Sequence, residues 1–137
     1  MTRKLLALAV PALLLIGGCV SVQATRIGTP TQYAPVPTEH VLVYRTEGEV
    51  DRPFERVAML WVEGDADVVD NRRMVDAARK NAGRLGANAV VLGEFQDPKL
   101  GTRILGHILD LPVERRASLL AIRVRPDSAA ATPQAAR

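Results

Sequence analysis

The apolar positions of the chain form one long run near its start and several shorter groups further on. The long run, residues 5–16, is interrupted only by Pro11 and follows the basic residues Arg3 and Lys4. It covers about twelve residues, whereas a helix that crosses a bilayer needs about twenty. A short apolar run between positive charge and small residues is typical of a secretory signal, so we expect residues 1–18 to be a signal peptide.

Four of the shorter groups are rich in β-forming residues and predict strands over residues 41–44, 54–62, 87–92 and 119–125. Residues 57–62 are apolar without a break, which is typical of a strand buried on both faces. In the last group, apolar residues alternate with Ala121, Arg123 and Arg125, which predicts a half-buried edge strand.

Between the second and third predicted strands, the pattern changes to the period of a helix. One apolar stripe, with spacings of three, four and three residues, is formed by Val75, Ala78, Ala82 and Leu85. Asp67 is the expected N-cap, Asp70 takes the capping-box position, and Gly86 is the expected left-handed residue after the helix. The predicted order is β-β-α-β-β, a two-layer α+β fold in which one helix packs on a small mixed sheet.

Shifts in composition mark the ends of the folded part. Residues 20–38 are rich in Pro, Gly and Thr and have no regular apolar period, which predicts a tether. Residues 126–137 are of low complexity and rich in Ala, which predicts a disordered tail. We therefore expect the folded domain over residues 39–125.

The end of the signal, Leu15-Ile16-Gly17-Gly18-Cys19, resembles the lipobox of bacterial lipoproteins. The resemblance implies cleavage before Cys19 and acylation of its thiol and amine, so that residues 19–38 are a lipidated cysteine and a flexible tether. Several acyl chains on one residue give stable membrane anchoring. Val20 stands where lipoproteins retained at the inner membrane usually carry Asp, so the expected location is the outer membrane, facing the periplasm. The alternatives are a secretory signal without lipidation and a buried structural thiol.

Composition removes several classes of function. Loss of Arg3 and Lys4 with the signal lowers the 18 basic side chains to 16, against 15 acidic ones, so the charge does not favour nucleic acid. Residues 83–86 match the Gly-x-x-Gly loop of RNA-binding KH domains, but they lead into a predicted strand of an exported chain. One cysteine excludes an internal disulfide framework and a Cys-based zinc site.

Residues 78–92 form the most distinctive stretch, and they resemble the Lys-Ala-x-x-Leu-Gly-Ala-Asn-Ala-Val pattern of small bacterial envelope lipoproteins. Similar signatures occur in the stress-sensor lipoprotein of the Rcs pathway and in YbjQ-type domains. The resemblance covers residues 39–125 and implies a shared fold more than a shared function. Disulfides hold the Rcs sensor domain, and this chain has no cysteine after Cys19, so a thiol-based sensing role is not implied.

Candidate chemistry is sparse. Asp65, Asp67 and Asp70 lack the central Gly and terminal Glu of a calcium loop, and with Glu63 they are expected to form a solvated turn and a helix cap. His40 and His107 have no ligand partners at metal-binding spacing. We therefore expect no catalytic residue, no metal site and no cofactor.

Residues 97–117 are the least regular part of the predicted domain. Gly101 and Gly106 allow mobility, and the apolar candidates for docking a partner are Ile104, Leu105, Ile108 and Leu109. The segment is interpreted either as a lid folded over an open sheet face or as a docking surface for an envelope partner or the bilayer.

These patterns predict a membrane-anchored, non-enzymatic lipoprotein whose small domain binds a partner or has a structural or sensing role in the cell envelope. The partners expected are the membrane, through the anchor, and an envelope protein, but no nucleic acid. The alternative is an envelope hydrolase or a module that binds a small ligand or metal, which would need a polar pocket with convergent titratable groups.

Overall fold

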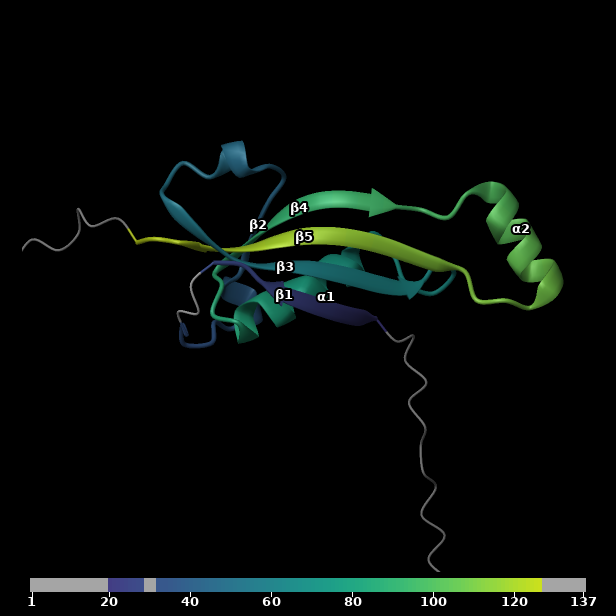
Figure 1. Cartoon of the computed structure of the whole chain (residues 1–137), viewed down its shortest axis with the longest axis horizontal. Helices are drawn as coiled ribbons and strands as arrows, with labels where there is room; N and C mark the ends of the chain where they lie inside the picture. Colours follow the sequence, from purple (N-terminus) through teal and green to yellow (C-terminus); the bar gives the residue numbers. More distant parts are fainter. Residues whose placement is uncertain (1–19, 29–31, 127–137) are drawn as a thin grey trace, which may run out of the picture.

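The computed structural model describes residues 20–28 and 32–126, which form one five-stranded sheet with two α-helices (Figure 1). The elements in chain order are β1 (Ser21–Arg26), the 3-10 turn η1 (Thr38–His40), β2 (Leu42–Tyr44), the 3-10 turn η2 (Glu47–Glu49), β3 (Phe54–Asp65), α1 (Asn71–Arg84), β4 (Ala89–Gln96), α2 (Leu100–Leu109) and β5 (Glu114–Val124). The strands lie in the order β1-β3-β5-β4-β2. Only the β2–β4 pair is parallel among these described strands.

The fold is α+β, but the predicted β-β-α-β-β architecture with a single helix is wrong. Two elements were not predicted: β1, which lies in the segment expected to be a tether, and α2, which lies in the irregular segment 97–117. The other strands lie close to their predicted ranges, although β5 begins five residues earlier than expected, at Glu114. Two expectations about these strands are wrong. β5 is the central strand and not an edge strand, because β3 and β4 pair with its two sides, and β3 is not buried on both faces, because Trp61 is 52% exposed.

β1 has almost no pattern that sequence analysis could detect. It pairs antiparallel with β3 from Ser21↔Glu63 to Arg26↔Ala58. Only Val22 is partly buried, because β1 is an edge strand and the rest of it faces solvent. Its stability therefore comes from backbone hydrogen bonds to a strand more than thirty residues away, which local composition does not encode.

α1 starts later than predicted, and its cap is a different aspartate. The carboxylate of Asp70 accepts a hydrogen bond from the amide of Arg73 at 2.8 Å, so Asp70 and not Asp67 is the N-cap. Asp67 stays in the turn before the helix. At the other end Gly86 has a φ of +83°, the left-handed residue that was expected after the helix.

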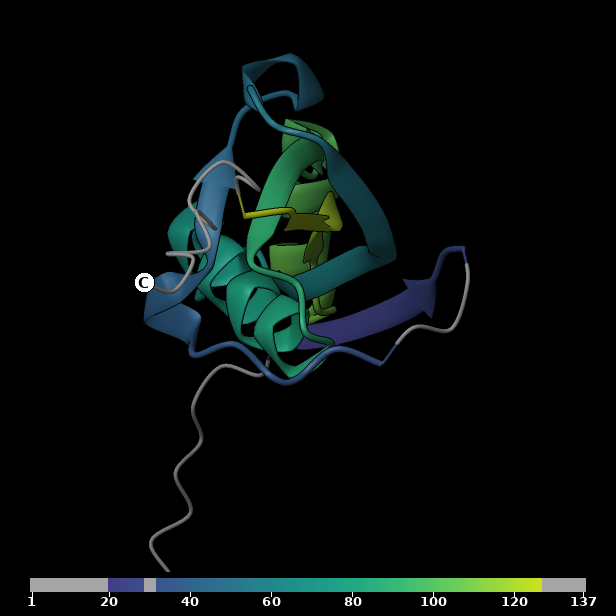
Figure 2. The ribbon, with the colours of Figure 1, turned by 90° about the vertical axis from the view of Figure 1, so that its left-hand side faces the viewer.

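Two apolar clusters fill the two faces of the sheet. α1 lies against one face of the sheet (Figures 1 and 2). It buries Met74, Ala78, Ala82 and Gly83 there, and the small side chains let the helix approach the strands closely. Part of the second face is packed against Tyr44, Val50 and Phe54 from the segment around η2. The end of this second face beyond Met59 is left open.

The segment before η1 closes against the C-terminal end of α1. The amide of Val36 donates to the carbonyl of Gly83 at 2.8 Å, and Tyr33 packs on Gly86. The phenol of Tyr33 donates to Glu55 at 2.5 Å, and the guanidinium of Arg123 lies 5.1 Å from its ring centre. The hydrogen bond to Glu55 is the largest cause that raises the pKa of Tyr33 above its ordinary value of 10.0.

Candidate functional site

One end of the sheet brings together the start of β1 and the whole of α2. Across this end, Ser21 pairs with Glu63, Glu63 with Arg116, and Arg116 with Gln96, so β1, β3, β5 and β4 share one row. α2 follows β4 and precedes β5, so it lies beyond the same end (Figure 1). The chain enters the sheet and α2 projects from it at one end of the domain.

α2 presents its apolar side chains to solvent. We define the apolar face of α2 as Leu100, Ile104, Leu105, Ile108 and Leu109. Their exposed fractions range from 52% for Ile104 to 74% for Leu100, and Leu111 directly after the helix is 57% exposed. At 3.6 residues per turn these five positions spread over about half of the helix circumference. In most globular proteins the apolar face of a helix packs against the core, whereas the apolar face of α2 is exposed to solvent.

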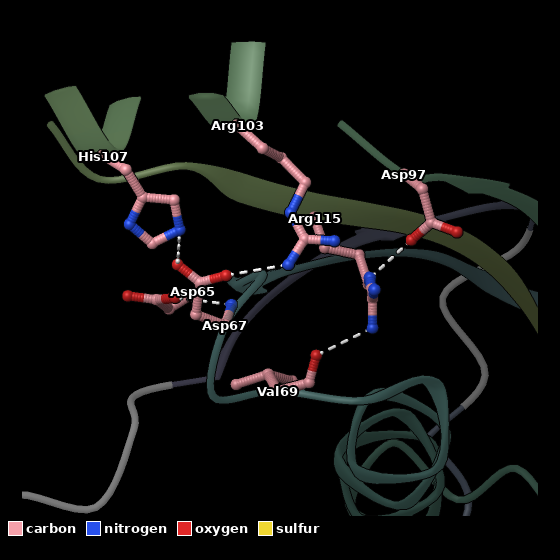
Figure 3. A network of polar contacts seen from close by, with 7 residues as sticks. All are labelled: Asp65, Asp67, Val69, Asp97, Arg103, His107 and Arg115. Carbon is pink, nitrogen blue, oxygen red and sulfur yellow. Dashed lines mark hydrogen bonds and ion pairs between the residues drawn. The ribbon is translucent and has the colours of Figure 1, made fainter. Parts of the chain in front are cut away.

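The opposite side of α2 is polar or small, and it is the side that contacts the domain. Arg103 donates to the carboxylate of Asp67 at 2.9 Å, and the Nε2 atom of His107 lies 3.5 Å from the other oxygen of Asp67 (Figure 3). Gly106 is the buried residue of the helix and rests against Val113. Asp67 therefore holds two successive turns of α2.

A second ion pair holds the base of the α2 segment. The Nε atom of Arg115 lies 2.5 Å from Asp97, just after β4, and its Nη1 atom donates to the carbonyl of Val69 at 3.0 Å (Figure 3). The amide of Ala66 also donates to the carbonyl of Val113 at 2.9 Å. These contacts join both flanks of α2 to the turn that precedes α1.

The four residues predicted to dock a partner, Ile104, Leu105, Ile108 and Leu109, all lie on the apolar face of α2. The helix stands beyond the end of the sheet and covers neither of its faces (Figures 1 and 2). A lid over the open face would bury these side chains, so the arrangement does not support the lid interpretation. Their role in docking a partner stays a prediction.

Cys19, the predicted lipidation site, lies outside the described residues, as do the predicted signal peptide 1–18 and residues 127–137 of the predicted tail. The first described residue is Val20, and β1 begins at Ser21. Among the helices in the described ranges, none is long and apolar enough to span a bilayer.

An open groove crosses the uncovered end of the second sheet face. It has a volume of about 540 Å³ and is lined mainly by Gln23, Trp61, Glu63, Glu94, Gln96, Arg116 and Ser118. Trp61 is 52% exposed, and the amide of Glu94 donates to the hydroxyl of Ser118 at 3.1 Å. Arg116 lies 3.2 Å from Glu63, so the charges of these two side chains offset each other.

The aspartates at the β3–α1 turn each make a different structural contact. Asp65 accepts from the amide of Asp67 at 2.8 Å, Asp67 binds Arg103, and Asp70 caps α1. Within residues 20–28 and 32–126, no group of three or more His, Cys, Asp or Glu side chains could hold a metal ion. His40 lies exposed in η1, apart from His107.

The contacts of Asp67 with α2 were not predicted, although the sequence holds one local signal for them. Arg103 and His107 are four residues apart, which places both on one side of a helix. Once 100–109 is read as a helix, the polar side and the apolar face follow from the spacing. The partner of that polar side lies 36 residues away from Arg103 and is set by the fold.

Comparisons with known proteins add a fold likeness. No family model matches the chain, and no curated protein matches it. A crystal structure of the Francisella virulence factor FvfA is similar, with a TM-score of 0.51 and 10% sequence identity, and the match covers 74% of this chain and 96% of that chain. At this identity the likeness shows a shared fold and nothing of function.

Proposed function

We propose that this protein is a lipoprotein of the bacterial cell envelope, anchored through acylated Cys19, with a small non-enzymatic domain that presents a binding surface close to the membrane. Its location would be the outer membrane, facing the periplasm. The proposal starts from the Leu15-Ile16-Gly17-Gly18-Cys19 sequence and the apolar run before it. The domain's role would be partner binding, structural support or sensing.

The position at which the sheet begins supports the proposal independently of the signal motif. β1 starts at Ser21, two residues after Cys19, so an acyl anchor on Cys19 would place the domain against the membrane without a tether. The end of the domain nearest the anchor would be the one that carries α2, whose apolar face is exposed. An anchored domain with an exposed apolar surface at its anchored end favours binding over catalysis.

Intact mass of the mature protein, purified from membranes in detergent, tests the anchor. The expected mass is that of residues 19–137 with acyl groups attached, and Cys19→Ser is expected to lose them and to leave the membrane fraction. A Val20→Ala variant is the matched control, since it changes the neighbouring residue and leaves the thiol. A mature chain without acyl groups, or a Cys19→Ser variant that fractionates like the parent, would contradict the proposal.

A second candidate is a module that binds a small ligand, and the Trp61 groove favours it. An exposed indole flanked by amide and carboxylate side chains suits a sugar ring, which stacks on the aromatic face and hydrogen-bonds at its edge. Titration of the protein with N-acetylglucosamine oligomers, followed by the fluorescence of its single Trp, tests this. A saturable change that Glu94→Ala weakens would support the candidate, and a flat titration would exclude these sugars.

A further inference from the structure

We infer that the apolar face of α2 lies in the membrane surface, at the boundary between lipid headgroups and acyl chains, beside the anchor. This inference rests on the proposed anchoring through Cys19. Lipid would then cover the apolar face of α2, and the protein would contact the bilayer at two points, the acyl anchor and α2.

α2 is amphipathic, and its polar side faces the domain. On the side of α2 that faces the domain, Arg103 and His107 contact Asp67 (Figure 3). Gly106 on the same side lies against Val113. The apolar face of α2 therefore points away from the domain, with every one of its five side chains more than half exposed. A helix turned this way needs an apolar environment outside the protein.

An anchor on Cys19 would lie a short distance from the α2 segment. The two residue steps from Cys19 to Ser21 span at most about 7 Å. From β1 to β4 the row Ser21–Glu63–Arg116–Gln96 crosses three strand spacings, or about 14 Å. The anchored end of β1 and the start of the α2 segment are thus separated by little more than the width of a few lipid headgroups.

The orientation of α2 relative to the strands suits a helix that lies in the membrane surface. Figure 1 shows α2 running across the strand direction at the end of the sheet. If the acyl anchor pulls this end of the sheet against the bilayer, the axis of α2 lies along the membrane plane. Its ten residues extend about 15 Å, and an interfacial helix buries its apolar side about 5–10 Å into the headgroup boundary.

The charges around α2 indicate that apolar burial, and not attraction to anionic lipid, drives this contact. Residues 97–116 carry a net charge of only +1, since four basic side chains (Lys99, Arg103, Arg115 and Arg116) accompany three acidic ones (Asp97, Asp110 and Glu114). Arg103 also forms an ion pair with Asp67, and Arg115 forms one with Asp97. Binding should therefore persist on uncharged lipid and change little with salt.

The test uses lipidated full-length mature protein in phosphatidylcholine vesicles whose acyl chains carry bromine, which quenches nearby indoles. Trp61 is replaced by Phe, and a single Trp is introduced as Ile108→Trp on the apolar face of α2. The matched control is Arg84→Trp, at an exposed position in the last residue of α1, the end of that helix that lies away from α2. We expect Ile108→Trp to lose about half of its fluorescence or more and to shift to the blue, while Arg84→Trp keeps its intensity.

Acylation is verified by intact mass on the same samples, so failure of the anchor and failure of the inference are distinguished. If the protein is acylated and vesicle-bound but Ile108→Trp is quenched no more than Arg84→Trp, lipid does not cover α2. A dimer of the Cys19→Ser chain that Ile104→Ser abolishes, together with absent quenching, would assign the face to a second copy instead. Quenching that disappears at high salt would overturn the argument from apolar burial.

Discussion

Gly106 and Val113 lie so close that a β-carbon built on Gly106 would overlap the Cγ2 atom of Val113. The contact sits on the side of α2 that faces the domain, directly after the turn that leads into β5. The contact gives a reason for a glycine in the second turn of α2: because Gly106 has no side chain, the helix can approach the rest of the domain closely.

Gly106→Ala is therefore expected to destabilise the protein, although alanine favours helices. Helix propensity alone would stabilise by up to ~1 kcal/mol, whereas overpacking typically costs about 1–3 kcal/mol. Hydrogen exchange of α2 amides and thermal unfolding measure the effect. Gly101→Ala is the control, because no atom of the described residues lies within 4 Å of a β-carbon there, and it should not destabilise. Equal effects of the two variants would contradict the packing of α2.

Replacement of Ile104 and Ile108 by Ser should leave global stability nearly unchanged. Both side chains are more than half exposed, and surface substitutions usually change the free energy of unfolding by less than about 0.5 kcal/mol. Leu119→Ala, at a fully buried position, should cost about 2–5 kcal/mol. Thermal unfolding compares the two. A large drop in melting temperature for the Ser variants would restore the lid interpretation that this structure does not support.

Asp67→Asn should loosen α2 without unfolding the domain. The carboxylate binds Arg103 and lies near His107, but the pairs are partly exposed, so the global cost should stay at about 0–1 kcal/mol. Faster hydrogen exchange confined to residues 100–109 is the expected result. Asp51→Asn, in an exposed pair with Arg52 away from α2, serves as the control and should leave α2 exchange unchanged.

Asp70→Ala should cost about 1 kcal/mol through loss of the α1 N-cap. For a folded part of this size such a loss lowers the melting temperature by roughly 4–8 °C. Asp76→Ala, on the exposed side of the same helix, should cost less. If Asp76→Ala lowers the melting temperature as much as Asp70→Ala does, the capping role of Asp70 is wrong.

Stability should fall at alkaline pH through Tyr33. Its pKa is raised in the folded protein, chiefly by the hydrogen bond to Glu55, so folding favours the protonated phenol. The contribution is present in full below pH 10.0, the ordinary pKa, and is lost as pH rises through the higher pKa of the folded state. Urea unfolding between pH 9 and 11 should show a decline that Tyr33→Phe reduces; an unchanged decline in Tyr33→Phe would exclude this residue as its source.

Much of the fold was predictable because its inner elements carry strong local patterns. The unbroken apolar run 57–62 lies in β3, between β1 and β5, so its prediction as a strand is correct. The expected burial on both faces is wrong, because Leu60 and Val62 are buried on one face whereas Trp61 on the other is 52% exposed. The stripe on α1 and the left-handed Gly86 follow directly from helix periodicity and backbone sterics. The N-cap was misplaced by three residues, since both Asp67 and Asp70 are good caps and the choice depends on where β3 ends.

The candidate site was predictable in its residues but not in its geometry. Ile104, Leu105, Ile108 and Leu109 stood out as apolar, yet their periodicity fits a lid as well as an outward face. Contacts from outside the helix decide which side of α2 faces the domain. Asp67 contacts Arg103 and His107, and Val113 packs on Gly106.

By itself, the sequence determined the approximate ranges of β2, β3, β4, β5 and α1 and the lipobox-like Leu15–Cys19 pattern, because each depends on neighbouring residues and on the period of a single element. Only the tertiary structure decided that Ser21–Arg26 completes the sheet as β1 and that α2 turns its apolar face outwards. Both outcomes depend on contacts between residues far apart in the chain, whose energies appear only when the backbone has brought the partners together.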